Sequence, residues 1–568
     1  MIQDINITVL PGEEGNESVI RRKAAEALSK NHETVKPEAI GALVFRKKSV
    51  DARHGRVLIN LRFTAYVGEL PPPERAEGEG FTPAWKKADP TRRVVIVGSG
   101  PAGLFAAHKL LESGITPIVV ERGKPTSERK RDIANITREQ RIDGDSNYCF
   151  GEGGAGTFSD GKLYTRSNKR GDIGRILAIF HHHGADADIL TDAHPHIGSD
   201  RLPEIINRMR ETIEKHGGSF RFGMKCSGLV IEGGRVTGIE ARHSASGDEG
   251  AAERIMGDAV ILATGHSARD VYAMLARLEP TSGMTGERAI LEGKTFAMGV
   301  RVEHPRELID RIQYHGQERG DDLPAATYRL VAQADGRGVY SFCMCPGGLI
   351  VPSATADDEI VLNGMSPSGR NTRWSNAAIV VETRVEDIPE RFRAPKATDA
   401  EASLSLPPSP VLSGLRYQMW LEREAKRHGE GQKAPAQRVR DFVDGRESET
   451  LPECSYSPGV VPSRLDQWLP EPIADRLREG FLEFNKNMRG FISDDAILVA
   501  AETRTSSPVR ILRDGETLES PALPELYPAG EGSGYAGGIV SSAMDGERAA
   551  DAIARSLASA GGAAGHGA

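Results

Sequence analysis

A glycine-rich turn near residue 100 has the spacing of a dinucleotide-binding motif. The apolar residues 94–97 precede it, and an amphipathic segment that extends to Leu111 follows it. Between a strand and a helix, such glycines form the tight turn, let a pyrophosphate approach the backbone and let the helix pack on the strand. The helix N-terminus supplies free N–H groups for the anion. The expected contacts are Gly98, Gly100, Pro101, Ala102 and Gly103.

An acidic residue follows the next predicted strand, residues 117–120. Glu121 stands twenty-one residues beyond Gly100, where a carboxylate accepts hydrogen bonds from the adenosine ribose. Its negative charge argues against a 2′-phosphate at this position. We assign its neighbour Arg122 to the same site.

Two further segments favour FAD over NAD. Residues 526–539, which run into a predicted helix at 540–557, resemble the segment that closes over the flavin in glutathione-reductase-like flavoproteins. Thr264 and Gly265, at the end of an apolar strand, resemble the second nucleotide-contacting turn of that class. The closing segment contributes Gly530, Glu531, Gly537, Gly538 and Ile539. A second strand-linked G-x-G-x-x-G is absent, so NAD(P)H is expected at most as a transient electron donor or acceptor.

Residues 151–161 form a loop that contains five glycines in eleven residues. Such a loop can direct several backbone N–H groups at a pyrophosphate or at the polar edge of a flavin, which stabilises the anionic reduced ring. The alternative is a glycine-rich surface loop. The cofactor contacts expected here are Gly153, Gly154, Ala155, Gly156, Thr157 and Ser159.

The segments 46–53, 147–163, 341–348 and 502–508 resemble an uncharacterised family of bacterial FAD-dependent dehydrogenases. These are glutathione-reductase-like flavoproteins with a small N-terminal α+β module, and the resemblance covers nearly the whole chain. It implies FAD binding and redox chemistry, and it does not imply a substrate.

Two residues are candidates for the chemistry beside the flavin. The Arg504 guanidinium could hold a substrate carboxylate in a bidentate fork, or it could form an internal salt bridge to Glu502 or another acid. Cys345, with Cys343, could be a redox pair, a substrate-side residue near the flavin, or a small buried residue before a turn. His181, His182 and His183 are consecutive on a predicted helix and cannot converge on one ion, so we expect no metal.

Composition limits the class of protein. The 568 residues carry a net charge of −8 without an acidic or basic block, so nucleic acid is an unlikely partner and a small-molecule substrate is expected. No stretch approaches 18 apolar residues, the N-terminus lacks a signal sequence, and five cysteines are few. We therefore expect a cytoplasmic protein without membrane contact; the oligomeric state cannot be read from the sequence.

The elements that must position these residues follow an α/β pattern. We expect a glutathione-reductase-like FAD-binding Rossmann core with an inserted mixed α+β substrate domain and a small N-terminal α+β domain. The predicted division is an N-terminal module at 1–70, a linker at 71–92, the first part of the core at 93–284, an inserted substrate or cap region at 285–500, the closing segment of the core at 501–557 and a disordered tail at 558–568.

The function that these features favour is an FAD-dependent oxidoreductase, a dehydrogenase or reductase that transfers a hydride between flavin N5 and an organic substrate. The alternatives are a flavin-dependent monooxygenase and an FAD-binding protein with a non-redox role or an RNA or protein partner. The last alternative would use residues 1–70 for the partner.

Overall fold

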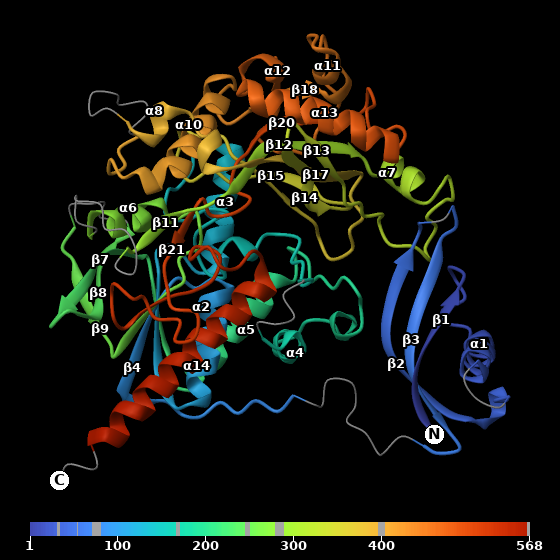
Figure 1. Ribbon diagram of the computed structural model, residues 1–568, viewed down its shortest axis with the longest axis horizontal. Helices are drawn as coiled ribbons and strands as arrows, with labels where there is room; N and C mark the ends of the chain where they lie inside the picture. Colours follow the sequence, from blue (N-terminus) through green and yellow to red (C-terminus); the bar gives the residue numbers. More distant parts are fainter. Residues whose placement is uncertain are drawn as a thin grey trace.

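The computed structural model describes residues 1–30, 34–53, 55–70, 81–165, 171–244, 250–278, 289–395 and 404–564. Figure 1 shows a parallel sheet with helices in the lower half, a larger sheet covered by helices in the upper half, and the N-terminal module at the right. The predicted fold class is confirmed: an α/β core carries an inserted mixed α+β region and a small N-terminal α+β module.

The core is a five-stranded parallel sheet. Its order is β22 (Leu526–Pro528), β10 (Ala259–Leu262), β4 (Asp89–Val97), β5 (Ile115–Glu121) and β6 (Ser219–Phe222). Because β5 and β10 lie on opposite sides of β4, the winding order reverses there. In open α/β sheets, ligands bind in the crevice at the carboxyl ends of the strands at such a reversal.

Alternation of side chains along β4 places apolar residues on both faces of this sheet. Val94 and Ile96 pack with α2 (Pro101–Glu112), α5 (Leu202–Lys215) and α14 (Ile539–Ala564). Val95 and Val97 pack on the opposite face with the antiparallel strands β7 (Met224–Glu232) and β8 (Arg235–His243) and with α6 (Arg269–Leu278). Both faces of the sheet are therefore buried, as a parallel sheet requires.

The inserted region is built on a seven-stranded mixed sheet in the order β13-β14-β17-β12-β20-β18-β19. The strands are β12 (Phe296–Pro305), β13 (Val331–Ala334), β14 (Arg337–Cys345), β17 (Trp374–Thr383), β18 (Ala434–Arg438), β19 (Val460–Pro462) and β20 (Ile497–Glu502). Helix α13 (Glu471–Asn487) packs through Phe481 and Phe484 into the large core cluster that also contains residues of β12 and β17. The sheet thereby forms a second rigid layer above the parallel sheet (Figure 1).

Smaller elements connect these layers. The remaining helices are α3 (Thr126–Arg138), α4 (Ile173–His182), α7 (Arg306–Gln313), α8 (Glu390–Arg393), α10 (Ser413–Arg427), α11 (Val439–Asp444) and α12 (Leu465–Trp468), and the remaining strands are β9 (Glu253–Met256), β11 (Leu291–Gly293), β15 (Leu349–Pro352), β16 (Leu362–Met365) and β21 (Val509–Ile511).

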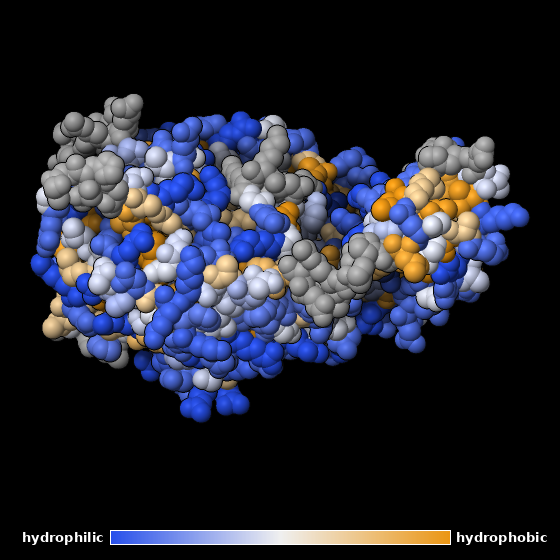
Figure 2. All heavy atoms as spheres, turned by 90° about the horizontal axis from the view of Figure 1, so that it is seen from below, coloured by the Kyte–Doolittle hydropathy of each residue, from blue (hydrophilic) through white to orange (hydrophobic). Residues whose placement is uncertain are grey.

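The N-terminal module is a three-stranded antiparallel sheet with one helix. Strand β3 (Leu58–Val67) lies between β1 (Ile2–Val9) and β2 (Ile40–Asp51), and α1 (Glu17–Ser29) packs on the sheet. Figure 2 shows apolar residues gathered on the surface of this module, at the right of the view. Four exposed large apolar side chains belong to it: Met1, Ile2, Leu10 and Leu70.

Two expectations about connecting segments need correction. Of the predicted linker, residues 71–80 lie outside the described residues, but Trp85 packs against His108, with ring centroids 4.8 Å apart, and β4 already begins at Asp89. The predicted disordered tail from residue 558 is helical as far as Ala564, because α14 continues through the alanine-rich segment. Residues 565–568 lie outside the described residues. The other predicted domain boundaries stay predictions.

Candidate functional site

A cavity of about 350 Å³ lies at the carboxyl ends of the parallel strands, between this sheet and the seven-stranded sheet. Its volume is within the range of about 300–1,000 Å³ that is typical of ligand pockets. Seventeen of the twenty residues that the sequence predicts as cofactor contacts line it: Gly98, Gly100, Pro101, Ala102, Glu121, Arg122, Gly154, Ala155, Gly156, Ser159, Thr264, Gly265, Gly530, Glu531, Gly537, Gly538 and Ile539. Segments from five separate parts of the chain therefore meet at one site.

The other three predicted contacts lie behind the cavity wall. A Cβ at Gly103 would lie 2.0 Å from the carbonyl oxygen of Gly98, and a Cβ at Gly153 would lie 2.1 Å from Oγ1 of Thr157. Thr157 is fully buried and donates a hydrogen bond to the carbonyl oxygen of Glu152 at 2.7 Å. These residues shape the two turns, and their predicted cofactor contact stays untested.

The turn before α2 brings bare backbone to the cavity. Gly98 has φ +104°, and a Cβ there would lie 2.4 Å from the carbonyl oxygen of Ala263. Gly100 is the N-cap of α2, with no side chain that accepts a hydrogen bond from the helix and with Pro101 at the first position. The helix N-terminus therefore presents its partial positive charge to the cavity.

Glu121 is held by four donors of the chain. The backbone N–H and the hydroxyl of Ser99 donate to its Oε2 at 2.9 and 2.8 Å, and the N–H groups of Gly123 and Gly151 donate to Oε1 at 2.9 and 3.0 Å. Arg122 forms an ion pair with Asp270 at 2.6 Å. Both residues line the cavity, and their predicted contact with a ribose stays a prediction.

The closing segment meets the turn after β10. Gly530 has φ +78°, and its N–H donates to Asp545 of α14 at 2.9 Å. Glu531 lies 3.5 Å from Nδ1 of His266, and the other ring nitrogen of this histidine is 3.0 Å from the carbonyl oxygen of Arg504. His266 itself lines the cavity.

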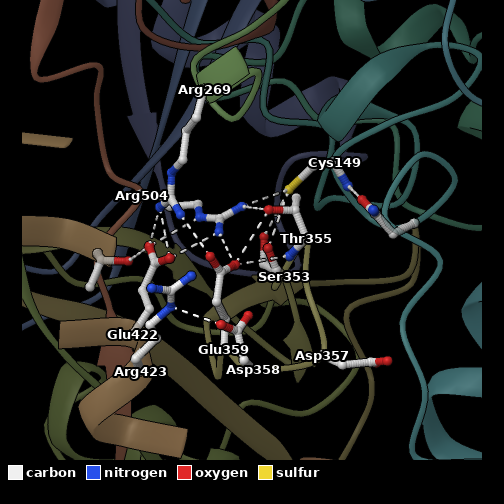
Figure 3. A network of polar contacts seen from close by, with 12 residues as sticks. Cys149, Arg269, Ser353, Thr355, Asp357, Asp358, Glu359, Glu422, Arg423 and Arg504 are labelled. Atoms are coloured by element: carbon white, nitrogen blue, oxygen red, sulfur yellow. Dashed lines mark hydrogen bonds and ion pairs between the residues drawn. The ribbon is translucent and has the colours of Figure 1, made fainter. Parts of the chain in front are cut away.

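Arg504 forms an internal ion pair, which is the alternative that its sequence context left open. Its Nη2 lies 2.8 Å from Glu359 and 3.0 Å from Glu422, and its Nη1 donates to Thr355 at 3.0 Å. Figure 3 shows these groups together with Arg269, which pairs with the same two carboxylates. The guanidinium that was predicted to hold a substrate carboxylate is thus paired with Glu359 and Glu422, and not with Glu502, which lies two residues before it in sequence.

The network around Arg504 is buried and balanced in charge. Burial raises the pKa of Glu422, but Arg269 and Arg504 lower it more, so that it falls to about 2. The same carboxylates raise the pKa of Arg504 against the opposite effect of burial. Because these residues come from α6, α10, the loop after β15 and the end of β20, the network joins the core to the inserted sheet.

The wall opposite the parallel sheet contains residues beyond the twenty predicted cofactor contacts. Phe342 and Cys343 of β14 and Asn363 of β16 line it, together with Lys162, which continues from the glycine-rich loop. Cys345, which the sequence predicts as a candidate for the chemistry, is fully buried and does not line the cavity. Strand pairing across the insertion brings these groups to the cavity, and short-range sequence patterns do not reveal such pairing.

The histidine run lies away from the cavity. His182 and His183 are in a cluster with Trp85 and His108, and His183 Nδ1 contacts the carbonyl oxygen of Ile179 at 2.7 Å. Burial lowers the pKa of His183 to about 4. Within the described ranges, the structure contains no group of three His, Cys, Asp or Glu side chains that could hold a metal ion. In the same residues, no helix is both long and apolar enough to span a bilayer.

Family models match four stretches of the chain. Residues 91–142 and 165–340 each match an "FAD binding domain", and residues 295–505 match "FAD-dependent protein, C-terminal domain-like". Residues 1–66 match "Domain of unknown function (DUF8436)". The matched stretches include the turn before α2 and the whole seven-stranded sheet.

A curated relative and several solved structures are similar to the chain. An uncharacterized protein of Clostridium beijerinckii is 39% identical over 466 residues, which cover 81% of this chain and 80% of the relative. A geranylgeranyl bacteriochlorophyll reductase-like protein from Thermoplasma acidophilum is 12% identical, with coverage of 82% and 79% and a TM-score of 0.33. The FrdA subunit of E. coli quinol fumarate reductase is 13% identical, with coverage of 83% and 71% and a TM-score of 0.32.

Proposed function

The chain belongs to the same family of FAD-binding proteins as the Clostridium beijerinckii relative, and from this premise we propose that it is an FAD-dependent oxidoreductase. In this proposal the enzyme transfers a hydride between flavin N5 and an organic substrate. The substrate lies between the cofactor and the wall of the seven-stranded sheet.

One observation carries the proposal: the cavity is lined by glycines that the packing of the protein itself does not require. A Cβ at Gly100 would meet no atom closer than Gly154 Cα at 3.8 Å, and a Cβ at Gly537 would meet nothing within 4 Å. Neither residue has a left-handed φ. Bare backbone at positions with free space is what close approach of a ligand requires.

The residues present fit FAD. The N-terminus of α2 and the loop at Gly154 would hold the pyrophosphate, and Glu121 would hold the adenosine ribose. Gly537 and Gly538 lie directly before α14; the N–H of Gly537 donates to Oγ of Ser541 at 3.1 Å, so Gly537 would offer its bare Cα and Gly538 its backbone N–H to the flavin ring. When bound, FAD supplies two-electron redox chemistry, and the protein supplies orientation and electrostatics.

The wall opposite the parallel sheet presents the positive charge of Lys162 to the substrate. Lys162 faces the cavity beside Asp160, which lies 3.5 Å from its ammonium group. Burial lowers the pKa of Lys162, but Asp160 and the two nearby thiols raise it by more than burial lowers it. The side chain therefore carries a positive charge. An anionic or polarised carbonyl substrate would be oriented by this charge.

The experiment is anaerobic. The FAD-loaded protein is photoreduced, and candidate oxidants are mixed with it while the visible absorbance of the flavin is followed; reduced nicotinamides are tested as donors with the oxidised protein. If the protein is an oxidoreductase, at least one organic compound reoxidises the flavin without oxygen, at a rate that saturates as the concentration of that compound rises. If reoxidation requires oxygen and an oxygen atom appears in the product, the monooxygenase alternative replaces the proposal.

A further inference from the structure

Two cysteines stand at the cavity without a part in the proposed hydride transfer. Cys343 is half-buried and lines the cavity, and Cys345 lies fully buried behind it. Both thiols are free. An accessible thiol backed by a buried one is the arrangement in which one sulfur attacks and the other resolves.

A bulge in β14 produces this arrangement. Phe342 pairs with Ala378 of β17 and Cys345 pairs with Asn376, so that β14 contains one residue more than its partner over this stretch. Cys343 has φ +44°, a backbone conformation that is uncommon for a residue with a Cβ. Bulges re-aim side chains near functional sites, and local strain of this kind gathers at such sites.

A lysine lies against both sulfurs. Lys162 Nζ is 3.9 Å from Cys343 Sγ and 3.6 Å from Cys345 Sγ. Asp160 fixes the ammonium group from the other side, and Arg370 holds Asp160 through an ion pair of 2.6 Å. The cation is therefore positioned at the thiols and is not a mobile surface charge.

A buried arginine, which forms an ion pair with Glu502 at 3.0 Å, lies on the other side of Cys343. Arg301 is fully buried, and its Nη1 donates to the carbonyl oxygen of Cys343 at 3.5 Å and to Asn376 at 2.6 Å. A Cβ at Gly364 would lie 2.2 Å from this guanidinium and 2.9 Å from Cys345 Sγ. The chain thus leaves out a side chain at Gly364 so that both groups fit together.

The two thiols have different acidities. A hydrogen bond from Cys345 holds the pKa of Cys343 well below its usual value, and Lys162 and Arg301 lower it further against the opposite effect of burial. The same hydrogen bond and burial raise the pKa of Cys345. The site therefore favours a thiolate on the accessible cysteine and a proton on the buried one.

We propose that Cys343 and Cys345 form a redox-active dithiol at the cofactor cavity, with Cys343 as the nucleophile, Cys345 as the resolving thiol and a disulfide as the substrate class. The proposal rests on the proposed function for its electron donor, which is reduced FAD. The disulfide would be the second substrate of that same site.

The proposed reaction consists of two thiol–disulfide exchange steps. Cys343 Sγ attacks one sulfur of the substrate disulfide, whose S–S bond breaks and releases a first thiol. Cys345 loses its proton and attacks Cys343 Sγ, which breaks the mixed disulfide, releases the second thiol and forms the Cys343–Cys345 bond. Two electrons and two protons, for which reduced FAD is the donor, return this bond to two thiols.

The first test needs no cofactor. The protein is labelled with iodoacetamide at pH 6, and the label on each cysteine peptide is measured by mass spectrometry. Cys343 is expected to react about tenfold faster or more than Cys226, which lines the same cavity but whose pKa burial raises to about 12. Lys162→Met should slow Cys343, and Lys162→Arg should restore its rate. Equal rates for Cys343 and Cys226 would overturn the proposal.

The second test traps the intermediate disulfide. Reduced Cys345→Ser is incubated with oxidised glutathione, and Cys343 is expected to carry a stable glutathione adduct. In the wild type the adduct is expected to resolve to an internal disulfide, and Cys343→Ser is expected to remain unlabelled at Cys345. A Cys345→Ser protein without an adduct on Cys343 contradicts the proposed nucleophile.

A reductive titration separates this inference from the proposed function. The oxidised, FAD-loaded wild type should take up twice as many reducing equivalents per flavin as Cys343→Ser. If both proteins bind FAD and take up the same amount, the dithiol is wrong and the proposed function stands. If FAD does not bind, the proposed function fails, and the labelling and trapping results still decide the dithiol.

Discussion

At the scale of single residues, the glycines at the cavity divide into two kinds. Gly98 and Gly103 are required by the fold, because a Cβ at either position would meet backbone atoms at 2.4 Å or less. Gly100 and Gly537 are not required by the fold, because a Cβ there would meet no atom of the chain closer than 3.8 Å. At the cavity, close approach of a ligand gives a reason for glycine at the second kind of position.

The substitution Gly537→Ala tests this division. We expect it to weaken FAD binding about tenfold or more, which is about 1.4 kcal/mol, while the thermal stability of the protein without FAD stays unchanged. The measurement is the quenching of flavin fluorescence on titration. Gly515→Ala is the control, since a Cβ there also meets nothing within 4 Å and the residue does not line the cavity.

The charge of Glu422 is central to the network between the layers. We expect Glu422→Gln to lower the free energy of unfolding in urea by about 3–5 kcal/mol, because two buried guanidinium groups lose a shared carboxylate. Glu424→Gln, on the same helix, removes an ion pair with the exposed Arg427 and should cost about 1 kcal/mol or less. Equal effects of the two substitutions would show that the network does not stabilise the junction.

Glu303 should make stability depend on pH. Burial raises its pKa to about 7, although Ser455 and Arg301 act in the opposite direction. The folded state therefore binds more protons than the unfolded state between about pH 4 and pH 7, and this residue lowers stability as pH rises through that window. Glu303→Gln should stabilise the protein by roughly 1–3 kcal/mol more at pH 8 than at pH 5, as measured by urea unfolding. A gain that is independent of pH would contradict the assignment.

At the scale of elements, the N-terminal module contacts the core through the edge of β2. The N–H of Lys48 donates to the carbonyl oxygen of Thr191 at 3.1 Å, and the N–H of Ala193 donates to the carbonyl oxygen of Lys48 at 3.0 Å. The Lys48 side chain pairs with Glu14 of its own module. The basic run at 46–48 thus contributes backbone docking, which its charge alone does not indicate.

The substitution Lys48→Pro should loosen this contact. It removes the outward N–H group without removing a hydrogen bond between β2 and β3, so hydrogen exchange should increase in residues 191–193 and less within the module. Lys48→Ala keeps the N–H group and serves as the control for the lost ion pair. Equal exchange in the two variants would show that the backbone contact does not hold the module.

Elements that depend on local patterns could be predicted from the sequence. The turn before α2, the parallel strands and the closing helix follow from apolar runs and glycines close in sequence, and most of their predicted residues line the cavity. The contact between Lys162 and Cys343 could not be predicted, because these residues meet only after β14 pairs with β17 and bulges at Cys343. The partners of Arg504 were missed for the same reason, since Glu359 and Glu422 are distant in sequence.

At the scale of the whole molecule, two rigid layers enclose the cavity and a buried ion network joins them. The parallel sheet provides the glycine turns, the seven-stranded sheet provides Phe342 and Cys343 of the opposite wall, and the loop after residue 161 provides the cation Lys162. A cofactor bound between them would contact both layers, so FAD should stabilise the folded protein, with a gain in free energy that rises with the logarithm of the FAD concentration above Kd.

The most direct test of the central claim is a spectrophotometric titration of the cofactor-free protein with FAD, done in parallel on Gly100→Ala. We expect saturation at one FAD per chain for the wild type and much weaker binding by the variant, with both proteins unfolding at the same temperature. A wild type that takes up no FAD, or a variant that binds FAD with undiminished affinity, would contradict that claim.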